Sequence, residues 1–266
     1  MNTNKPKLGQ NFLIDQNATL QIVDALGDIA SRTVVEIGPG RGAITSLLAS
    51  RAHRLVAVEF DPALARALRR DFAAKPNVEV LERDVLTVDF RSLLGADAPA
   101  VAVGNLPYYI TSPILTHLFA AHSLFSTLVL MVQREVADRV AAAPGSSDYG
   151  LLSATAQLYS EVQSLFTLPP SAFDPPPDVY STVLRFNIRP RFAELAVEPA
   201  PFLAFLKAGF QQKRKTLTNN LRAAGYEPAA VLSSLAAAGI ESNARAEAVP
   251  LPQMAGLYKH LLPQTP

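Results

Sequence analysis

The fold is decided by residues 33–43, which read TVVEIGPGRGA. Residues 33–37 are an apolar, β-branched run that predicts a buried strand. A glycine turn over residues 38–42 follows at once, and the apolar pattern through Leu48 predicts a helix. Glycines let the backbone turn tightly and approach a ligand, and the helix N-terminus offers free N–H groups. This order of strand, turn and helix indicates an α/β fold that binds a nucleoside-containing cofactor.

Acidic side chains stand at the ends of the next two predicted strands. The strand expected over residues 54–58 ends at Glu59, whose carboxylate can accept hydrogen bonds from both hydroxyls of a ribose. The strand expected over residues 78–81 is followed by Asp84, which can accept from the amine of an adenine ring. An isolated Asp is more often a cap, so the position of Asp84 in a row of strand ends is what favours binding.

A dinucleotide-binding fold has nearly the same pattern. Gly38, Gly40 and Ala43 satisfy its G-x-G-x-x-[G/A] form, and Glu59 lies at about the expected distance. The glycine turn alone therefore does not exclude a nicotinamide-dependent oxidoreductase, nor a tight turn that binds no ligand.

The next predicted strand, an apolar run at residues 98–103, ends in an unusual loop, GNLPYY at residues 104–109. Pro107 lacks an N–H, so this backbone cannot continue a regular ladder. Asn105 offers one acceptor and one donor group, and Tyr108 offers a flat ring with a polar tip. Together they can grip a planar group that carries an exocyclic amine, although a plain loop with a core tyrosine fits the residues as well.

A proline-rich segment, FDPPPDVYS at residues 173–181, is the second unusual stretch. Three consecutive prolines hold a chain extended at low entropy. That rigidity would fix Phe173, which is a candidate second wall for the slot begun by Tyr108. The alternative is a simple spacer between strands.

The pattern becomes helical beyond residue 190. Residues 185–222 hold eight Lys or Arg and two Glu, a local net charge of +6 in a chain whose formal net charge is +1. Lys213, Arg214 and Lys215 are the densest part, and Arg222 lies further along the same basic segment. Such a cluster attracts a phosphate backbone, although an ordinary solvated helix face is the alternative. We expect a catalytic domain over 1–189, with an N-terminal arm at 1–15, and a helical RNA-binding domain over 190–266.

Composition excludes several classes of site. The 266 residues include no cysteine, which excludes disulfides, thiolate metal sites and a cysteine nucleophile. No run reaches the ~18 apolar residues of a membrane helix, and the N-terminus lacks the apolar block of a signal peptide. The four histidines are scattered, without metal-ligand spacing. We therefore expect a cytoplasmic protein with no metal and no membrane partner.

Taken together, these motifs resemble the ribosomal RNA adenine dimethyltransferases, most closely the small-subunit type. The motifs that carry the resemblance are GQNFL at 9–13, EIGPGRG at 36–42, NLPY at 105–108, FxPxPxVxS at 173–181 and KRKTLxNNL at 213–221. The resemblance spans nearly the whole chain. It implies the α/β fold of class I S-adenosylmethionine-dependent methyltransferases, with a Rossmann-like, mostly parallel seven-stranded sheet, and a small all-helical C-terminal domain.

The resemblance also implies roles for single residues. The implied cofactor contacts are Asn11, Leu13, Gly38, Gly40, Glu59, Asp84 and Asn105. The implied substrate is a pair of adjacent adenosines near the 3′ end of small-subunit (16S) rRNA, in the pre-30S subunit, each receiving two methyl groups on N6. As a mechanism, we expect Asn105 Oδ1 and the Leu106 carbonyl to accept the two N6 hydrogens. The implied catalytic group is Asn105, Leu106, Pro107, Tyr108 and Phe173, with the base between the two rings. We expect a monomer.

Two rivals remain open. A large-subunit (23S) rRNA methyltransferase of the erythromycin-resistance type would share the chemistry. A non-catalytic nucleic-acid-binding factor of ribosome assembly would share the fold. Intact Asn105, Pro107 and Tyr108 argue against lost catalysis.

Overall fold

The computed structural model describes residues 10–262 and divides into two compact units. The first holds the residues up to 137 together with 163–188, and the second holds 138–162 together with the residues from 189 onward. Residues 1–9 of the expected arm lie outside the described residues. The assignment of catalysis and RNA binding to separate domains stays a prediction.

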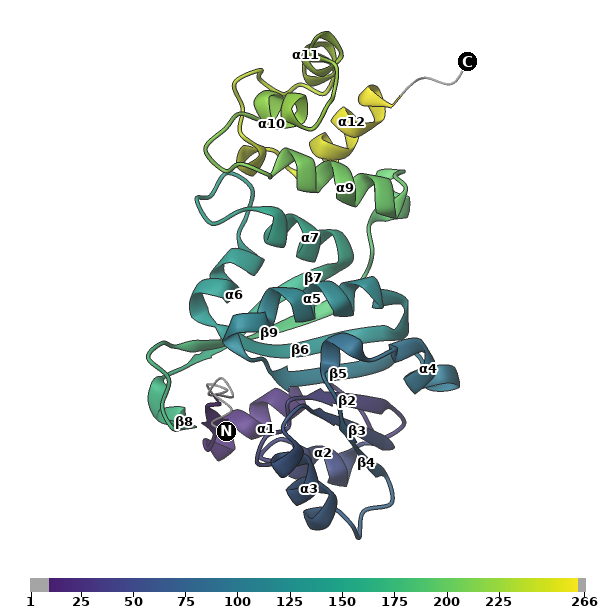
Figure 1. Ribbon diagram of the computed structural model, residues 1–266, viewed down its shortest axis with the longest axis vertical. Helices are drawn as coiled ribbons and strands as arrows, with labels where there is room; N and C mark the ends of the chain where they lie inside the picture. The colour runs from purple at the N-terminus through teal and green to yellow at the C-terminus, as the bar shows by residue number, and fades with distance from the viewer. Residues whose placement is uncertain (1–9, 263–266) are drawn as a thin grey trace, which may run out of the picture. The chain divides into compact units, whose positions relative to one another are not determined.

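A seven-stranded sheet forms the first unit, in the order β4-β3-β2-β5-β6-β9-β7 (Figure 1). Strands β4 to β6 in this order run parallel, and β9 runs antiparallel to β6. The predicted fold class is confirmed. The strands are β2 (Thr33–Ile37), β3 (Arg54–Glu59), β4 (Val78–Glu82), β5 (Ala100–Asn105), β6 (Phe125–Gln133), β7 (Ser160–Leu168) and β9 (Ser181–Ile188).

The order of the strands reverses direction between β2 and β5, because β3 and β4 lie on one side of β2 while β5 and β6 lie on the other. In open α/β sheets, ligands bind at this switch point, outside the carboxyl ends of the strands. The two strands approach closely there: a Cβ atom on Gly104 would lie 2.5 Å from the Ile37 carbonyl oxygen. Glycine is therefore required just before Asn105.

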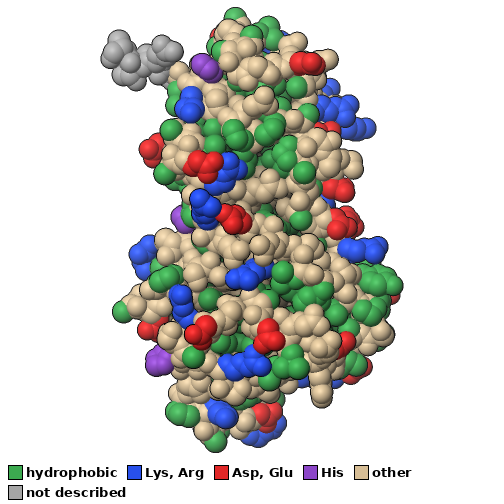
Figure 2. Space-filling model, turned by 180° about the vertical axis from the view of Figure 1, so that it is seen from behind, with side chains coloured by type: hydrophobic (Ala, Val, Ile, Leu, Met, Phe, Trp, Pro, Cys, Tyr) green, Lys and Arg blue, Asp and Glu red, His purple; other side chains and the backbone are tan. Residues whose placement is uncertain are grey.

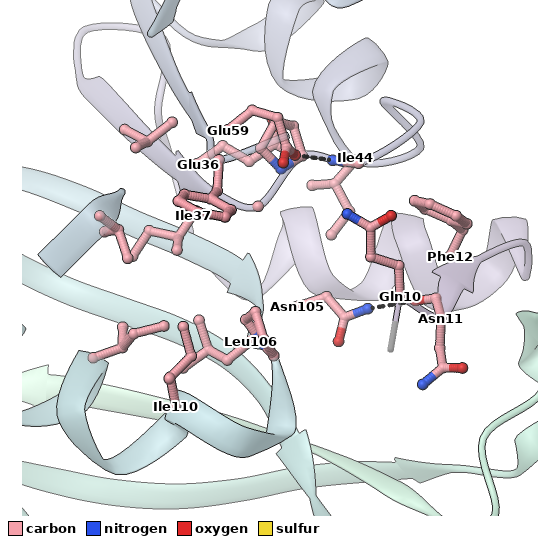
Figure 3. Close-up of a pocket in the computed structure, with 18 of the residues that line it drawn as sticks. Gln10, Asn11, Phe12, Glu36, Ile37, Ile44, Glu59, Asn105, Leu106 and Ile110 are labelled. Atoms are coloured by element: carbon pink, nitrogen blue, oxygen red, sulfur yellow. Dashed lines mark hydrogen bonds between the residues drawn. The ribbon is translucent and has the colours of Figure 1, made fainter. Parts of the chain in front are cut away.

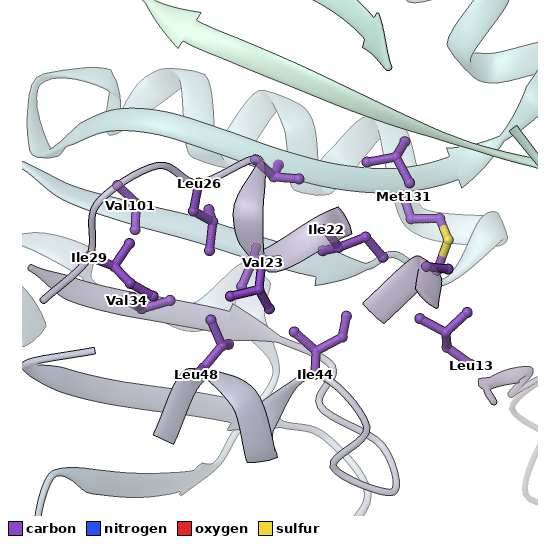
Figure 4. Packing of buried hydrophobic residues seen from close by; sticks show 14 of the residues in the cluster. Leu13, Ile22, Val23, Leu26, Ile29, Val34, Ile44, Leu48, Val101 and Met131 are labelled. Atoms are coloured by element: carbon purple, nitrogen blue, oxygen red, sulfur yellow. The ribbon is translucent and has the colours of Figure 1, made fainter. Parts of the chain in front are cut away.

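Alternating side chains of the sheet supply the hydrophobic core. Ile22 of α1 and Leu48 of α2 pack in one cluster with Val34, Val101 and Met131 of the central strands (Figure 4). This alternation follows from the period of two along a strand, which sends neighbouring residues to opposite faces. The helices of this region are α1 (Gln16–Asp24), α2 (Thr45–Arg51), α3 (Pro62–Asp71), α4 (Phe90–Leu94), α5 (Thr111–Ala120) and α6 (Arg134–Ala141).

A second, two-stranded sheet joins the N-terminal arm to the proline-rich segment. Strand β1 (Phe12–Leu13) pairs antiparallel with β8 (Phe173–Asp174), with Leu13 opposite Phe173. The Ile14 amide extends the pairing by donating to the Ala172 carbonyl at 2.9 Å. The pairing gives the arm a fixed path across the first unit.

The residues beyond 190 are helical, as their sequence pattern predicted. The second unit also includes residues 138–162, which the sequence analysis had placed in the catalytic domain. Its core is aromatic: the rings of Phe202 and Phe205 lie 5.4 and 5.3 Å from the ring of Tyr258. The helices are α7 (Leu151–Tyr159), α8 (Phe192–Leu195), α9 (Pro199–Gly209), α10 (Leu217–Ala223), α11 (Pro228–Ala237) and α12 (Leu251–Leu261).

Surface charge is mixed in sign. On the face that Figure 2 shows, Lys and Arg side chains are interleaved with Asp and Glu, in keeping with the formal net charge of +1. Within residues 10–262, no helix has the length and apolar character needed to cross a membrane. Over the same residues, no group of three or more His, Cys, Asp or Glu is placed to hold a metal ion.

Candidate active site

A pocket of about 370 Å³ opens at the carboxyl ends of β2 and β5, at the switch point of the sheet. A cavity of this size is in the range of small-molecule sites. Its lining residues come from segments 10–13, 36–44, 58–60, 83–86 and 105–110, with Ile114. Segments that are far apart in the sequence therefore converge on one cavity.

The glycine turn and the end of β3 are tied together by Glu59. Its carboxylate accepts from the Gly40 amide at 3.0 Å (Figure 3) and from the Asp61 amide at 2.8 Å. Burial raises the pKa of Glu59 above its usual value, and the two amide hydrogen bonds oppose that rise. At Gly40, φ is +60° and a Cβ atom would lie 2.9 Å from the Phe12 ring. Only glycine fits between the turn and the arm.

Glu36 is a buried acid that also lines the pocket, and the sequence analysis gave it no role. Its side chain is 1% exposed, and its Oε2 atom has no hydrogen-bond partner. Burial, assisted by the nearby charge of Glu59, raises the pKa of Glu36 to about 8. The sequence signal was an acid inside an otherwise apolar strand, because such a residue is seldom buried without a ligand or partner.

Asp84 both caps a turn and faces the cavity. Its Oδ1 atom accepts from the Leu86 amide at 3.0 Å, which begins the short 3₁₀ helix Val85–Thr87. The same residue lines the pocket. The cap and the binding interpretation are therefore compatible at this position.

Asn105 ends β5, and its side-chain amide has a fixed orientation. Its Nδ2 atom donates to the Asn11 carbonyl at 3.0 Å, so its Oδ1 atom points away from the arm (Figure 3). The Leu106 amide donates to the Met131 carbonyl at 3.0 Å. The Pro107 carbonyl is already used, because it accepts from the Thr111 hydroxyl at 3.1 Å. The loop backbone is thus held on both sides of Leu106.

The Tyr108 ring lines the pocket, and a hydrogen bond to Ser181 fixes its hydroxyl. The hydroxyl lies 2.8 Å from the hydroxyl of Ser181, which is fully buried at the start of β9. Burial raises the pKa of the Tyr108 phenol above its usual value, and the hydrogen bond to Ser181 opposes that rise. One hydrogen bond therefore joins the loop after β5 to the end of the proline-rich segment.

Phe173 lies elsewhere than the sequence analysis expected. Its side chain is 2% exposed and belongs to the main hydrophobic cluster. It is absent from the pocket lining, where the expectation had placed it as a second wall. The reason is the β1–β8 pairing, which sets Phe173 opposite Leu13 and buries both side chains.

The arm is also held by Arg41 of the glycine turn. The Arg41 guanidinium lies 4.2 Å from the centroid of the Phe12 ring and forms a 2.8 Å ion pair with Asp174. Stacking of a guanidinium on an aromatic face is attractive. The contact joins the cofactor turn, the arm and the proline-rich segment. We call Phe12, Arg41 and Asp174 the arm clasp.

The basic residues of the second unit form an exposed loop, residues 212–215, that lines a hollow of about 530 Å³. The buried Asn220 side chain supports it by donating to the Gly209 carbonyl at 2.7 Å and the Gln212 carbonyl at 3.2 Å. The Lys213 ammonium donates to the Ser147 carbonyl at 2.6 Å. Arg222 is exposed on α10. Asn220 of this motif is therefore a structural residue that supports the loop.

Known proteins match this chain over almost its full length. The family model described as "Ribosomal RNA adenine dimethylase" matches residues 1–262. A protein of Acidobacterium capsulatum named "Ribosomal RNA small subunit methyltransferase A" is 56% identical, over 97% of this chain and 91% of its own length. A protein of the same name from Koribacter versatilis is 53% identical, over 97% of this chain and 94% of its own length.

Solved structures agree on the fold. The 23S rRNA methyltransferase ErmE superposes with a TM-score of 0.71 at 27% identity, covering 94% of this chain and 99% of its own. A dimethyladenosine transferase from Plasmodium falciparum superposes with a TM-score of 0.80 at 23% identity, covering 92% of this chain and 95% of its own. With the family model matching nearly every residue, the chain belongs to the ribosomal RNA adenine dimethylase family.

Proposed function

We propose that this protein transfers methyl groups from S-adenosylmethionine to N6 of two adjacent adenosines near the 3′ end of small-subunit rRNA. One observation carries the proposal: the fixed amide of Asn105, whose oxygen is directed away from the arm at the edge of the pocket. The names of the relatives at 56% and 53% identity support the small-subunit RNA over the large-subunit alternative, whose example here, ErmE, is 27% identical.

The lining of the pocket fits S-adenosylmethionine. Its two buried acids are Glu36 and Glu59, and the unpartnered oxygen of Glu36 is one group that a polar ligand would satisfy. A ligand with a sulfonium and an ammonium charge would favour the ionised form of both carboxyls. Glu59 stands at the strand end, where an acid binds ribose hydroxyls. We assign the adenine amine to Asp84 and the remaining contacts to Asn11, Leu13, Gly38, Gly40 and Asn105.

The adenine amine is a weak nucleophile because its lone pair is delocalised into the ring. Asn105 Oδ1 and the Leu106 carbonyl would accept its two hydrogens and draw the nitrogen towards tetrahedral geometry. The Pro107 carbonyl cannot serve equally well, since Thr111 already donates to it. When bound, the cofactor supplies a methyl group on an activated leaving group. The chain itself then contributes mainly positioning, which can lower a barrier by ~7–11 kcal/mol.

Tyr108 offers the face on which the target base would stack. Its hydroxyl is fixed by Ser181, so the ring is already oriented before a base arrives. Stacking on one aromatic ring is worth ~1–3 kcal/mol per base, which offsets part of the cost of extruding the adenosine. Phe173 is buried beside Leu13 and would stabilise the position of the arm without contacting the base. The basic loop of the second unit would bind the RNA backbone, in the cytoplasm where small subunits are assembled.

The proposal is tested with labelled S-adenosylmethionine and ribosomal subunits that lack the modification. We expect label on N6 of two adjacent adenosines in the small-subunit RNA and none in the large-subunit RNA. The Asn105→Ala variant should lose ~10²-fold or more in turnover, the cost of misplacing a reacting group, while keeping its affinity for small subunits. Label in the large-subunit RNA, or near-normal turnover of the variant, would overturn the proposal.

A further inference from the structure

Two tyrosine rings of the first unit, Tyr109 and Tyr180, are exposed, and the mechanism above uses neither. Tyr109 is 64% exposed and lines the edge of the pocket. Tyr180, in the proline-rich segment, is 46% exposed. Most large rings of this chain are buried, because exposing them forfeits their hydrophobic stabilisation. An open ring at the edge of the pocket, such as that of Tyr109, is therefore a candidate contact for a planar ligand.

The two exposed tyrosines are the sequence neighbours of one hydrogen-bonded pair of the first unit. Tyr109 follows Tyr108 directly, and Tyr180 directly precedes Ser181. The hydroxyls of Tyr108 and Ser181 lie 2.8 Å apart, so one hydrogen bond joins the two chain segments that carry the exposed rings. Successive Cα atoms are about 3.8 Å apart, so the backbone of each exposed tyrosine lies one residue away from this hydrogen-bonded pair.

A cation accompanies the second ring. The Arg134 guanidinium lies 5.1 Å from the centroid of the Tyr180 ring, and the Arg134 amide donates to the Tyr180 carbonyl at 2.9 Å. Arg134 is exposed at the start of α6. A planar cation next to an aromatic face suits nucleic-acid bases and phosphates alike. The exposed acids Glu135 and Asp178 are close in sequence to this pair, so phosphate attraction alone is a weak explanation.

We propose that Tyr109, with Tyr180 and Arg134, forms a stacking surface at the mouth of the pocket for the nucleotide next to the target adenosine. The inference rests on the proposed function. Extruding one base removes a stacking partner from its neighbour, and an exposed ring beside the pocket replaces that partner. For a substrate of two adjacent adenosines, this surface would hold the second base while the first is methylated.

The first test uses a short single-stranded RNA with the fluorescent base 2-aminopurine placed directly before or directly after an adenosine. The wild-type protein should quench the probe in at least one of the two positions. Tyr109→Ala should lose that quenching, and Tyr109→Phe, which keeps the ring, should retain it. Leu20→Ala, an exposed apolar residue on α1, is the matched control and should behave as wild type.

The second test is kinetic, with small subunits as substrate. Removing a base stack worth ~1–3 kcal/mol should lower kcat/KM by ~5–150-fold for Tyr109→Ala, mostly through KM. The fraction of product with both adenosines modified should fall as well. Equal kinetics and equal quenching for wild type and Tyr109→Ala would overturn the inference, as would a Phe variant that fails like the Ala variant.

The two proposals fail in different ways. Tyr109-dependent quenching without methyl transfer to small-subunit RNA would overturn the proposed function and leave the stacking surface standing. Methyl transfer that depends on Asn105, with no role for Tyr109 in either test, would do the reverse. Quenching by Tyr109 in one probe position only would also tell which neighbour, 5′ or 3′, occupies the surface.

Discussion

The single residue with the largest electrostatic cost in the pocket is Glu36. Its carboxyl is buried with one oxygen unpartnered, and burial raises its pKa to about 8. The folded protein therefore holds this proton more tightly than the unfolded chain does. Protonated Glu36 makes its full contribution to the free energy of unfolding below pH 4.5, the pKa of the unfolded state. That contribution is lost as the pH rises to about 8.

Glu36→Gln, which mimics the protonated acid, should therefore stabilise the cofactor-free protein. The stability difference between variant and wild type should grow from about pH 5 to about pH 8 and then level off, reaching a few kcal/mol on the scale of ~1.4 kcal/mol per pKa unit. Thermal unfolding at several pH values measures it. A difference that is constant across this range would show that Glu36 titrates normally.

At the scale of elements, the arm clasp links two structures that the sequence keeps apart. Asp174 does not line the pocket, yet it is paired with Arg41 of the cofactor turn and faces Phe12 in the β1–β8 sheet. Removing it should loosen the arm over the cavity. Because the ion pair is largely exposed, its contribution is only ~0–1 kcal/mol, so the effect on cofactor affinity should be modest.

Asp174→Ala should thus weaken S-adenosylmethionine binding by ~2–5-fold, measured by calorimetry. In an Arg41→Ala background the same change should have no further effect, which a double-mutant cycle detects. Asp178→Ala, exposed in the same proline-rich segment, is the matched control. Additive losses at positions 41 and 174 would mean that the two side chains act independently.

The same elements show how far the sequence could predict the structure. Strands β2, β3 and β5 were predicted because each is a dense apolar run bounded by glycine or by polar residues, and such local patterns need no knowledge of the rest of the chain. Strands β1 and β8 have two residues each and exist only through each other. Their pairing depends on long-range contact, so the burial of Phe173 could not be read from the motif around it.

At the scale of the whole molecule, RNA affinity should depend on salt through the basic loop. Arg214 and Lys215 are exposed, whereas the Lys213 ammonium is already bonded to the Ser147 carbonyl. Each lost phosphate contact reduces the slope of log affinity against log salt by ~0.7–0.9. Sequence alone marked all three residues equally, because the hydrogen bond to Ser147 crosses a long stretch of chain.

The paired change of Arg214 and Lys215 to Ala should therefore lower that slope by ~1.5, and Lys213→Ala should lower it less. Binding of small subunits at several salt concentrations gives the slopes. Arg66→Ala, which removes one exposed positive charge from α3, is the control that matches Lys213→Ala in charge. A slope unchanged by the double variant would remove the basic loop from the path of the RNA.

The β1–β8 pairing has a consequence for the order in which the protein matures during its own synthesis. The Asn11 carbonyl cannot accept its hydrogen bond until Asn105, 94 residues later, has been translated. Arg41 cannot form its ion pair until Asp174, 133 residues later, has been translated. At ~5–20 residues per second, the arm leaves the ribosome on the order of ten seconds before its partners exist. In a nascent chain of this protein, Arg41 therefore has no Asp174 to pair with, and β1 has no β8, until residue 174 has been translated.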